Sequence, residues 1–226
     1  MTGQMVKFTS IGNDCEGYLA TPASGHGPGI IVLQEWWGLV DHIKKICDRF
    51  AEAGFVALAP DLYHGESTTH PDNAGRLMMA LNIERTESDL RGAVNFLLEH
   101  EATTSSKVGT VGFCMGGQLS LYAACANENV GACVNYYGIH PDVKPNLATL
   151  QAPVLGFFAE KDSSVPPVAA RQLETDLKAA GKKVEIHIYE GADHAFFNNT
   201  RPEVFNAVYA QDSWTKMLTF FHAELS

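Results

Sequence analysis

Basic residues are scarce in this 226-residue sequence. Its 16 lysines and arginines stand against 26 aspartates and glutamates, which gives a formal net charge of −10. Phosphate backbones and anionic lipid surfaces repel such a surplus of negative charge. The composition therefore argues against nucleic acid or a membrane surface as the main partner.

Long apolar runs and paired cysteine motifs are also missing. No stretch approaches the ~20 apolar residues that cross a bilayer, and the segment MTGQMVKFTS lacks the apolar core of a secretory signal. The cysteines, an odd number, show no disulfide framework and no zinc-like spacing; they stand at positions 15, 47, 114, 125 and 133. We therefore expect a cytoplasmic protein without a metal or another cofactor.

The chain alternates predicted strands with predicted helices. It has no repeat, low-complexity tract or linker, so we expect a single domain over residues 1–226. The alternation predicts an α/β fold, a mainly parallel sheet with helices on both faces. About eight strands are predicted, at 6–10, 16–21, 28–34, 55–59, 108–111, 130–137, 153–159 and 183–189. The first two should pair antiparallel, because the connection at Gly12 and Asn13 is too short for a crossover.

Helices are predicted between most of these strands. The ranges are 39–53, 90–99, a segment starting at 119, 167–180 and 203–223. Residues 61–82 interrupt the alternation, since they are rich in turn formers and become weakly helical only near 76–81. A segment of this length indicates a cap or a functional loop.

A cysteine framed by glycines follows the predicted strand 108–111. The motif GFCMGG centres on Cys114 and has the pattern G-x-C-x-G-G. With serine in place of cysteine, this is the strand-turn-helix elbow that displays the nucleophile of α/β-hydrolases. Glycines permit the sharp turn, and a helix N-terminus favours a thiolate over a thiol. The alternative is a small buried cysteine in a packing turn, and the motif alone does not decide between the two.

Two other predicted strands end in reactive side chains. Asp162 follows the strand 153–159, and His194 follows the strand 183–189. Because parallel strands end at one edge of the sheet, Cys114 should meet both residues there, in the nucleophile, acid, histidine order of α/β-hydrolases. His194 would pair with the thiolate and carry protons, while Asp162 would orient the imidazole.

Each member of this set also has a plainer interpretation. Asp162 alone could be a turn carboxylate, and His194 alone could be a solvated surface group. Asp193 is a rival acid, but the side chain of an immediate neighbour points the wrong way to orient His194. The order and the strand-end positions favour the catalytic interpretation.

The predicted strand 28–34 leads into a further motif, QEWWG. Acyl transfer needs two backbone N–H groups around the developing oxyanion, and we assign these to Met115 and Trp36. Glu35 stands at the end of a buried strand, where a carboxylate is costly without a partner. It could turn to solvent, pair with an arginine or lysine, or hydrogen-bond the thiol of Cys114, and spacing leaves these alternatives open.

The motifs QEWWG, GFCMGG, AEKDSSVP and GADHAFFN together resemble the dienelactone hydrolase family, also called carboxymethylenebutenolidases. The resemblance covers nearly the whole chain. It implies an α/β-hydrolase fold and hydrolysis of a lactone or small ester through an acyl-cysteine, with Cys114, Asp162 and His194 as the triad. It also implies that Glu35 keeps the resting thiol partly protonated and accepts its proton when substrate arrives.

The sequence departs from this family where a substrate carboxylate would bind. In the muconate-pathway enzymes of the family, arginines hold that carboxylate, and one of them lies four residues past the histidine, where this chain has Asn198. Arg76 and Arg201 could substitute, or could be ordinary surface arginines. Aromatic residues that could shape an acyl site, or serve only in packing, are Trp37, Tyr137 and Phe196.

The sequence therefore predicts a cysteine-dependent hydrolase whose partner is a small ester or lactone, with a monomer favoured. The alternative is a ligand-binding or thiol redox-sensing protein on a hydrolase scaffold, in which Cys114 is oxidised reversibly. Transfer of the acyl group to an acceptor other than water also stays open.

Overall fold

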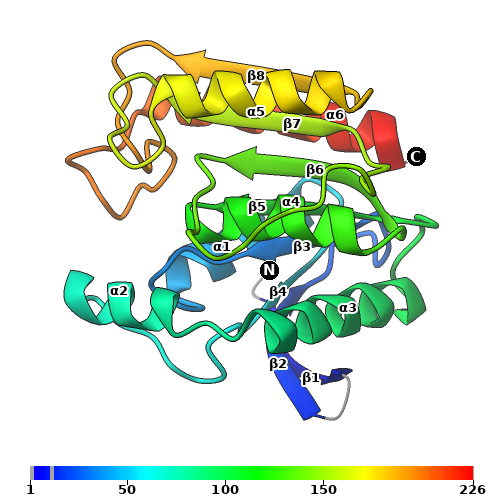
Figure 1. Ribbon diagram of the computed structural model, residues 1–226. Coiled ribbons are helices and arrows are strands. Elements are labelled where there is room, and N and C mark those ends of the chain that lie inside the picture. Colours follow the sequence, from blue (N-terminus) through cyan, green and yellow to red (C-terminus); the bar gives the residue numbers. More distant parts are fainter. Residues whose placement is uncertain (1–2, 11–12, 226) are drawn as a thin grey trace.

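A single eight-stranded sheet forms the centre of the protein, in the order β1-β2-β4-β3-β5-β6-β7-β8 (Figure 1). The computed structural model describes residues 3–10 and 13–225. The strands are β1 Gln4–Ser10, β2 Asn13–Ala20, β3 Gly29–Leu33, β4 Val56–Pro60, β5 Val108–Phe113, β6 Val130–Tyr136, β7 Val154–Ala159 and β8 Val184–Tyr189. The predicted mainly parallel sheet is confirmed.

The first two strands form an antiparallel edge on this sheet. β1 pairs with β2 and β2 pairs with β4 in antiparallel register, and every later pairing is parallel. The predicted pairing of the first two strands is confirmed, while Gly12 in their connection lies outside the described residues. β3, β4, β5 and β7 are buried along their whole length, as expected for strands covered on both faces.

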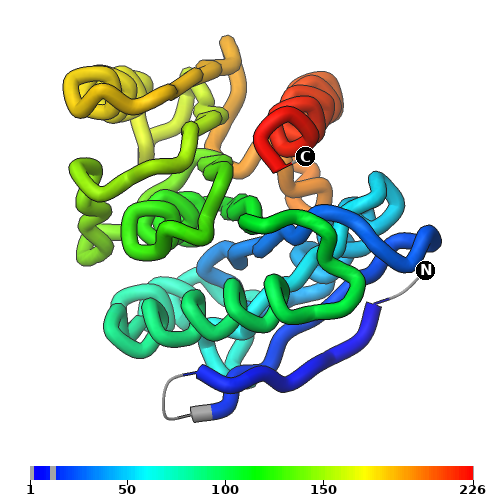
Figure 2. The backbone as a smooth tube through the Cα atoms, turned by 90° about the vertical axis from the view of Figure 1, so that its right-hand side faces the viewer, coloured from blue at the N-terminus to red at the C-terminus, as the bar shows by residue number. Residues whose placement is uncertain are grey.

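Helices cover both faces of the sheet. They are α1 Asp41–Glu52, α2 Pro71–Met79, α3 Ile83–Glu99, α4 Met115–Ala126, α5 Pro167–Ala179 and α6 Ala207–Leu225. The core on one face is completed by α1 and α6, and the core on the other face by α3, α4 and α5. Figure 2 shows α5 (yellow) and α6 (red) on opposite sides of the strands.

The segment 61–82 differs in detail from the expectation. It begins with a tight turn in which the Asp61 carboxylate accepts the N–H groups of Tyr63 and Gly65, at 3.2 and 2.7 Å. It then contains α2, which starts at Pro71, a residue suited to the first turn of a helix. Helical structure therefore starts earlier than the predicted 76–81.

Two predicted helices also begin earlier than expected. α3 starts at Ile83 rather than Leu90, because the Asn82 side chain caps it by accepting the N–H of Arg85 at 3.0 Å. α4 starts at Met115 rather than Leu119, immediately after the turn at Cys114. In both helices a cap or a turn determines the first residue, and the apolar periodicity used for the prediction does not indicate where that residue lies.

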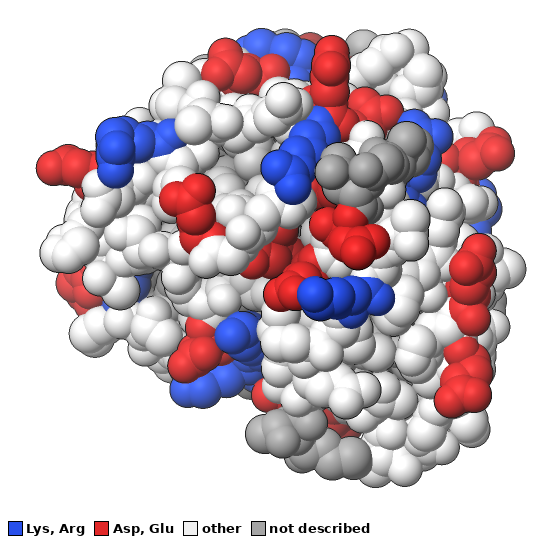
Figure 3. All heavy atoms as spheres, turned by 90° about the horizontal axis from the view of Figure 1, so that it is seen from below, with Lys and Arg blue, Asp and Glu red and all other residues white. Residues whose placement is uncertain are grey.

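The described surface matches the acidic composition. On the face seen in Figure 3, acidic and basic groups are interspersed, without a broad basic patch. All five cysteines are free in the described structure. Among the described helices, none combines the length and the apolarity needed to cross a membrane.

Truncating the α6 side chain that packs beneath the sheet should destabilise the protein strongly. Phe221 is fully buried and packs against Phe50 and Phe55. We expect Phe221→Ala to lower the free energy of unfolding by about 3 to 5 kcal/mol, measured by denaturant titration. Val208→Ala on the same helix is the control: its side chain is 74% exposed, so the change should stay within about 0.5 kcal/mol. Equal losses in the two variants would contradict this packing.

Candidate active site

Cys114 occupies a strained turn between β5 and α4. Its backbone has φ 53° and ψ −120°, a conformation that costs a side-chain-bearing residue energy. The turn is possible because glycine flanks it on both sides: a Cβ added to Gly112 would lie 1.9 Å from the carbonyl oxygen of Gly116. Cys114 is 8% exposed and lines a cavity at the sheet edge. Observed strain at such a turn is a common mark of a functional site.

His194 and Asp162 meet at the same edge. His194 Nδ1 lies 2.6 Å from Asp162 Oδ2, and the other oxygen of this buried carboxylate accepts the N–H groups of Ser164 and Val165, both at 2.8 Å. Asp193 makes no such contact in the described structure and is exposed. The carboxylate that can orient the imidazole is therefore that of Asp162.

The electrostatics of His194 follow from this contact. Burial works to lower the pKa of His194, but hydrogen bonds and charges from Asp162 and Cys114 outweigh it and raise the pKa to about 10. The imidazole is therefore suited to carry a proton at neutral pH.

Glu35 lies inside the protein rather than at its surface. It is 2% exposed, and its Oε2 accepts a hydrogen bond of 2.7 Å from Asn198 Nδ2. Burial raises the pKa of Glu35, although Asn198, His194 and Arg201 act to lower it. Its Oε1 has no hydrogen-bond partner among the described residues. Of the three alternatives, the turn to solvent does not occur, and no ion pair with a lysine or arginine is found among the described residues.

Two backbone N–H groups near the elbow are free to donate. Met115 is the first residue of α4, so its N–H has no carbonyl within the helix. Neither Met115 nor Trp36 donates its N–H to another backbone or side-chain acceptor in the described structure. Trp36 lines the same cavity as Cys114. The two groups predicted for oxyanion binding are thus unoccupied donors.

One cavity of about 390 Å³ contains most of these side chains. Its size suits a small substrate rather than a polymer. The lining combines apolar and charged groups: Glu35, Trp36, Trp37, Met78, Cys114, Ile139, Lys161, Ser163, Ser164, Asp193, His194, Ala195, Arg201 and Val204.

The predicted substrate contacts divide into two groups. Trp37 and Arg201 line the cavity, and Arg201 also pairs with Glu203 at 2.9 Å. Tyr137 and Phe196 are fully buried in the aromatic core and do not line it. Arg76 is exposed on α2 and contacts Asn73 instead. These placements do not support substrate contacts for Tyr137, Phe196 or Arg76, because the rings fill the core and the guanidinium faces solvent.

Sequence reasoning missed two cavity-related residues. In the sequence, Asn198 marks only a departure from a family arginine, whereas in the structure its amide holds the buried Glu35. Lys161 lines the cavity beside Asp162, and its place next to the acid in AEKDSSVP was the available signal.

The fold and the strained elbow define a hydrolase of the α/β-hydrolase class. Residues 15–225 match the model of the dienelactone hydrolase family, and the chain belongs to this family. It is 39% identical to Protein usf of Aquifex pyrophilus, over 99% of this chain and 100% of that protein. It is 36% identical to a protein of Aquifex aeolicus named "Putative carboxymethylenebutenolidase", over 99% of each chain.

A solved structure shows the same fold. It is a dienelactone hydrolase-like promiscuous phosphotriesterase from metagenomic libraries, with a TM-score of 0.89 at 22% identity, covering 100% of this chain and 99% of that one. The predicted family resemblance and the predicted α/β-hydrolase fold are both confirmed.

Removing the charge of Asp162 should lower the pKa of His194 from about 10 towards its ordinary value near ~6.5. Asp162→Asn keeps an oxygen for the N–H groups of Ser164 and Val165 but removes the negative charge beside the ring. NMR titration of labelled histidine would measure the shift. Asp193→Asn, an exposed neighbour, should leave the His194 titration unchanged; a similar shift in both variants would contradict the assignment of the partner.

Proposed function

We propose that this protein is a cysteine-dependent hydrolase of a small carboxylic ester or lactone. The single observation that carries the proposal is the convergence of Cys114, on its strained turn, with the His194–Asp162 pair at 2.6 Å on one cavity. A nucleophile, a base and an orienting carboxylate are the parts that covalent acyl transfer needs.

In the first half-reaction, the Cys114 thiolate attacks the carbonyl carbon of the bound ester. The carbonyl oxygen becomes an oxyanion, which the N–H groups of Met115 and Trp36 stabilise by hydrogen bonds. The tetrahedral intermediate then collapses, the bond to the alkoxy oxygen breaks, and protonated His194 gives its proton to that oxygen. The products are an acyl-cysteine and an alcohol; for a lactone, both remain in one molecule.

In the second half-reaction, water replaces the alcohol. Neutral His194 takes a proton from the water as its oxygen attacks the thioester carbon. The same two N–H groups stabilise the second oxyanion, and the carbon–sulfur bond breaks. Cys114 leaves as a thiolate beside protonated His194, so the ion pair that attacked the ester is restored. Asp162 holds the imidazole in one orientation through both steps.

Glu35 supplies a second proton acceptor close to the thiol. Burial raises its pKa, and its Oε1 is unpartnered among the described residues. In our proposal, this oxygen shares a proton with Cys114 in the resting enzyme and withdraws it when substrate arrives. The hydrogen bond from Asn198 to Oε2 keeps the carboxyl group in place.

The cavity lining carries charged groups of both signs, with Glu35 and Asp193 beside Lys161 and Arg201. Lys161 and Arg201 bring two positive side chains to it, while Trp36 and Trp37 offer an apolar wall. We propose that Arg201 and Lys161 meet a substrate carboxylate where family members use arginines at other positions. The ester or lactone would lie between this charged end and Cys114.

Replacing the proposed nucleophile should abolish hydrolysis. We expect Cys114→Ala to lower kcat/KM for p-nitrophenyl acetate by on the order of 10³-fold or more, measured by release of p-nitrophenol. Cys125→Ala, another buried cysteine outside the cavity, should retain activity and serves as the control. Wild-type activity in Cys114→Ala would refute the assignment.

Mass spectrometry during turnover separates hydrolysis from the redox-sensing alternative. The proposal predicts an acyl adduct on Cys114 that disappears as substrate is consumed. A sulfenic acid under peroxide, with no acyl adduct under any ester, would favour sensing instead.

Removing the Glu35 carboxylate should change how the rate depends on pH. Burial raises the pKa of Glu35, so in the wild type this group loses its proton at a higher pH than an exposed glutamate. Glu35→Gln removes that titration, and we expect an altered pH profile of kcat/KM and of iodoacetamide alkylation at Cys114. Glu99→Gln, exposed at the end of α3, is the control. Superimposable profiles for Glu35→Gln and wild type would exclude the proposed proton sharing.

A further inference from the structure

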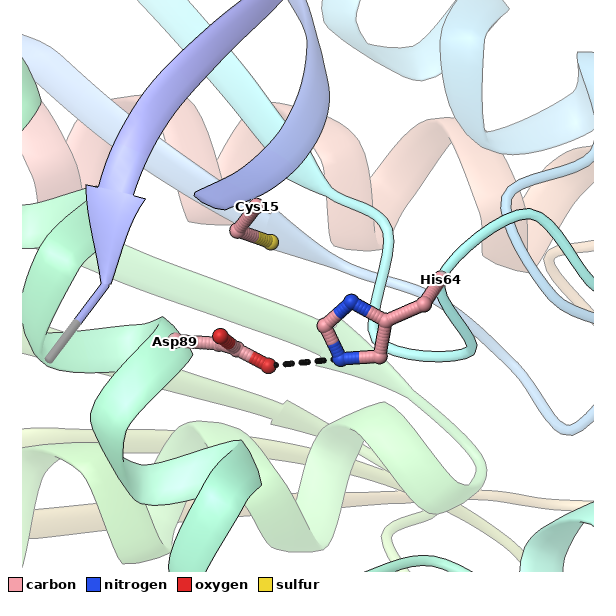
Figure 4. A group of neighbouring side chains, drawn as sticks. All are labelled: Cys15, His64 and Asp89. Atoms are coloured by element: carbon pink, nitrogen blue, oxygen red, sulfur yellow. Dashed lines mark ion pairs between the residues drawn. The ribbon is translucent and has the colours of Figure 1, made fainter. Parts of the chain in front are cut away.

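A second group of reactive side chains lies apart from the cavity described above. Cys15 comes from β2, His64 from the turn after β4, and Asp89 from α3 (Figure 4). The sulfur of Cys15, one ring nitrogen of His64 and one carboxylate oxygen of Asp89 all lie within 4.8 Å of one another. Cys15 and His64 are 49 positions apart along the chain, and His64 and Asp89 are 25 positions apart, yet the three side chains lie together.

The carboxylate in this group is buried and poorly satisfied. Asp89 is 1% exposed, and neither of its oxygens accepts a well-aligned hydrogen bond from a described residue. Its partner is His64, whose Nε2 lies 2.9 Å from Oδ2. Burying a carboxylate costs free energy when its only partner makes a poorly aligned contact. A further cationic partner would therefore stabilise Asp89.

The other two members are also unusual. His64 has φ 52°, a strained backbone conformation for a residue with a side chain. Cys15 is fully buried, and burial, followed by the charges of Asp89 and Asp61, raises the pKa of its thiol to about 12, although Arg85 acts to lower it. The proposed hydrolase mechanism uses none of these three residues.

We propose that Cys15, His64 and Asp89 form a binding site for a divalent transition metal of the zinc type. Sulfur, imidazole nitrogen and carboxylate oxygen are ligands that zinc accepts in tetrahedral sites. A metal bound here would neutralise the Asp89 carboxylate and the Cys15 thiolate together. On binding, the thiol loses its proton to solvent, so the charges of the three ligands and the ion balance to zero.

To bind one metal ion, the three ligand atoms of Cys15, His64 and Asp89 must shift slightly from their present positions. Zinc ligands lie about 2.0 to 2.3 Å from the metal, so neighbouring ligand atoms in a tetrahedral site are about 3.3 to 3.6 Å apart. The contact between His64 and Asp89, at 2.9 Å, is already near this separation. The sulfur must approach by roughly 1 Å, together with a rotation of the imidazole. The His64 side chain is 22% exposed, which leaves room for that rotation.

His64 borders an adjacent cavity that offers room for a fourth ligand. It has a volume of about 160 Å³, and His64, Tyr63, Arg85 and Thr86 are among its lining residues. Water in this cavity could complete the coordination, since three protein ligands and one water form an open zinc site. This cavity shares no lining residue with the cavity of Cys114.

A metal at this position would tie three elements together. It would join β2 and α3 to the turn that carries Tyr63, whose hydroxyl lies 3.2 Å from the sulfur of Met115. The expected consequence is structural: metal binding stabilises the turn 61–65 next to the first turn of α4.

Cobalt substitution tests the site directly. Chelator-treated protein is titrated with Co²⁺, which reports tetrahedral coordination by its visible bands and thiolate ligation by a charge-transfer band. We expect about one equivalent bound per chain with a thiolate band, and zinc should displace the cobalt. Absence of any stoichiometric thiolate band would overturn the proposal.

Matched variants locate the site. Cys15→Ser should remove the thiolate band, and His64→Gly, which tolerates φ 52°, should weaken cobalt binding at least about tenfold. Cys114→Ser and Cys125→Ser should both retain the band. A band that persists in Cys15→Ser, or that disappears in Cys114→Ser, would place the metal elsewhere. If Cys15→Ser fails to fold, the affinity of His64→Gly decides, because unchanged cobalt binding in that variant refutes the site.

Discussion

The first turn of α4 packs against the end of β3 so closely that a Cβ on Gly116 would lie 2.4 Å from the Leu33 carbonyl oxygen. The close contact between α4 and β3 determines how the rest of the site is arranged. It forces Cys114 into its strained backbone conformation and brings the thiol beside the loop that carries Glu35 and Trp36. The energy stored in the turn, of order 1 to 3 kcal/mol, is supported by the buried strands on either side. Rigid strands thus hold Cys114 in a backbone conformation that residues with a side chain rarely adopt.

Local signals explain why most of the sheet could be predicted from the sequence. Apolar runs bounded by glycine and proline predicted the strands, and strand ends predicted that Asp162 and His194 would meet. Contacts that depend on side-chain packing rather than on where strands end could not be predicted. The hydrogen bond from Asn198 to Glu35 spans 163 positions, and nothing in either neighbourhood indicates it. Tyr137 illustrates the converse, since an aromatic residue after a strand can fill the core as readily as it can line a cavity.

Glu35 shows how one buried carboxyl group can be tolerated. A positive partner at the position of Asn198 would pair with the carboxylate and favour its charged form. The amide instead holds one oxygen by a hydrogen bond without adding charge, so burial dominates and raises the pKa. In the proposed mechanism, this leaves the carboxyl group able to exchange a proton with its surroundings. In the proposed mechanism, the neutral amide of Asn198 thus lets Glu35 keep the thiol of Cys114 partly protonated.

The position of α6 has a consequence for the order in which the chain is synthesised. This last helix covers β5, β6 and β7, and it directly follows the loop that contains His194. As the polypeptide grows from its N-terminus, β3, β5 and the turn at Cys114 leave the ribosome well before His194 and the helix that seals the core. The sulfur is thus made before the imidazole that would pair with it. In a nascent chain, the thiol of Cys114 therefore lacks this imidazole until the segment with His194 has been synthesised and has folded.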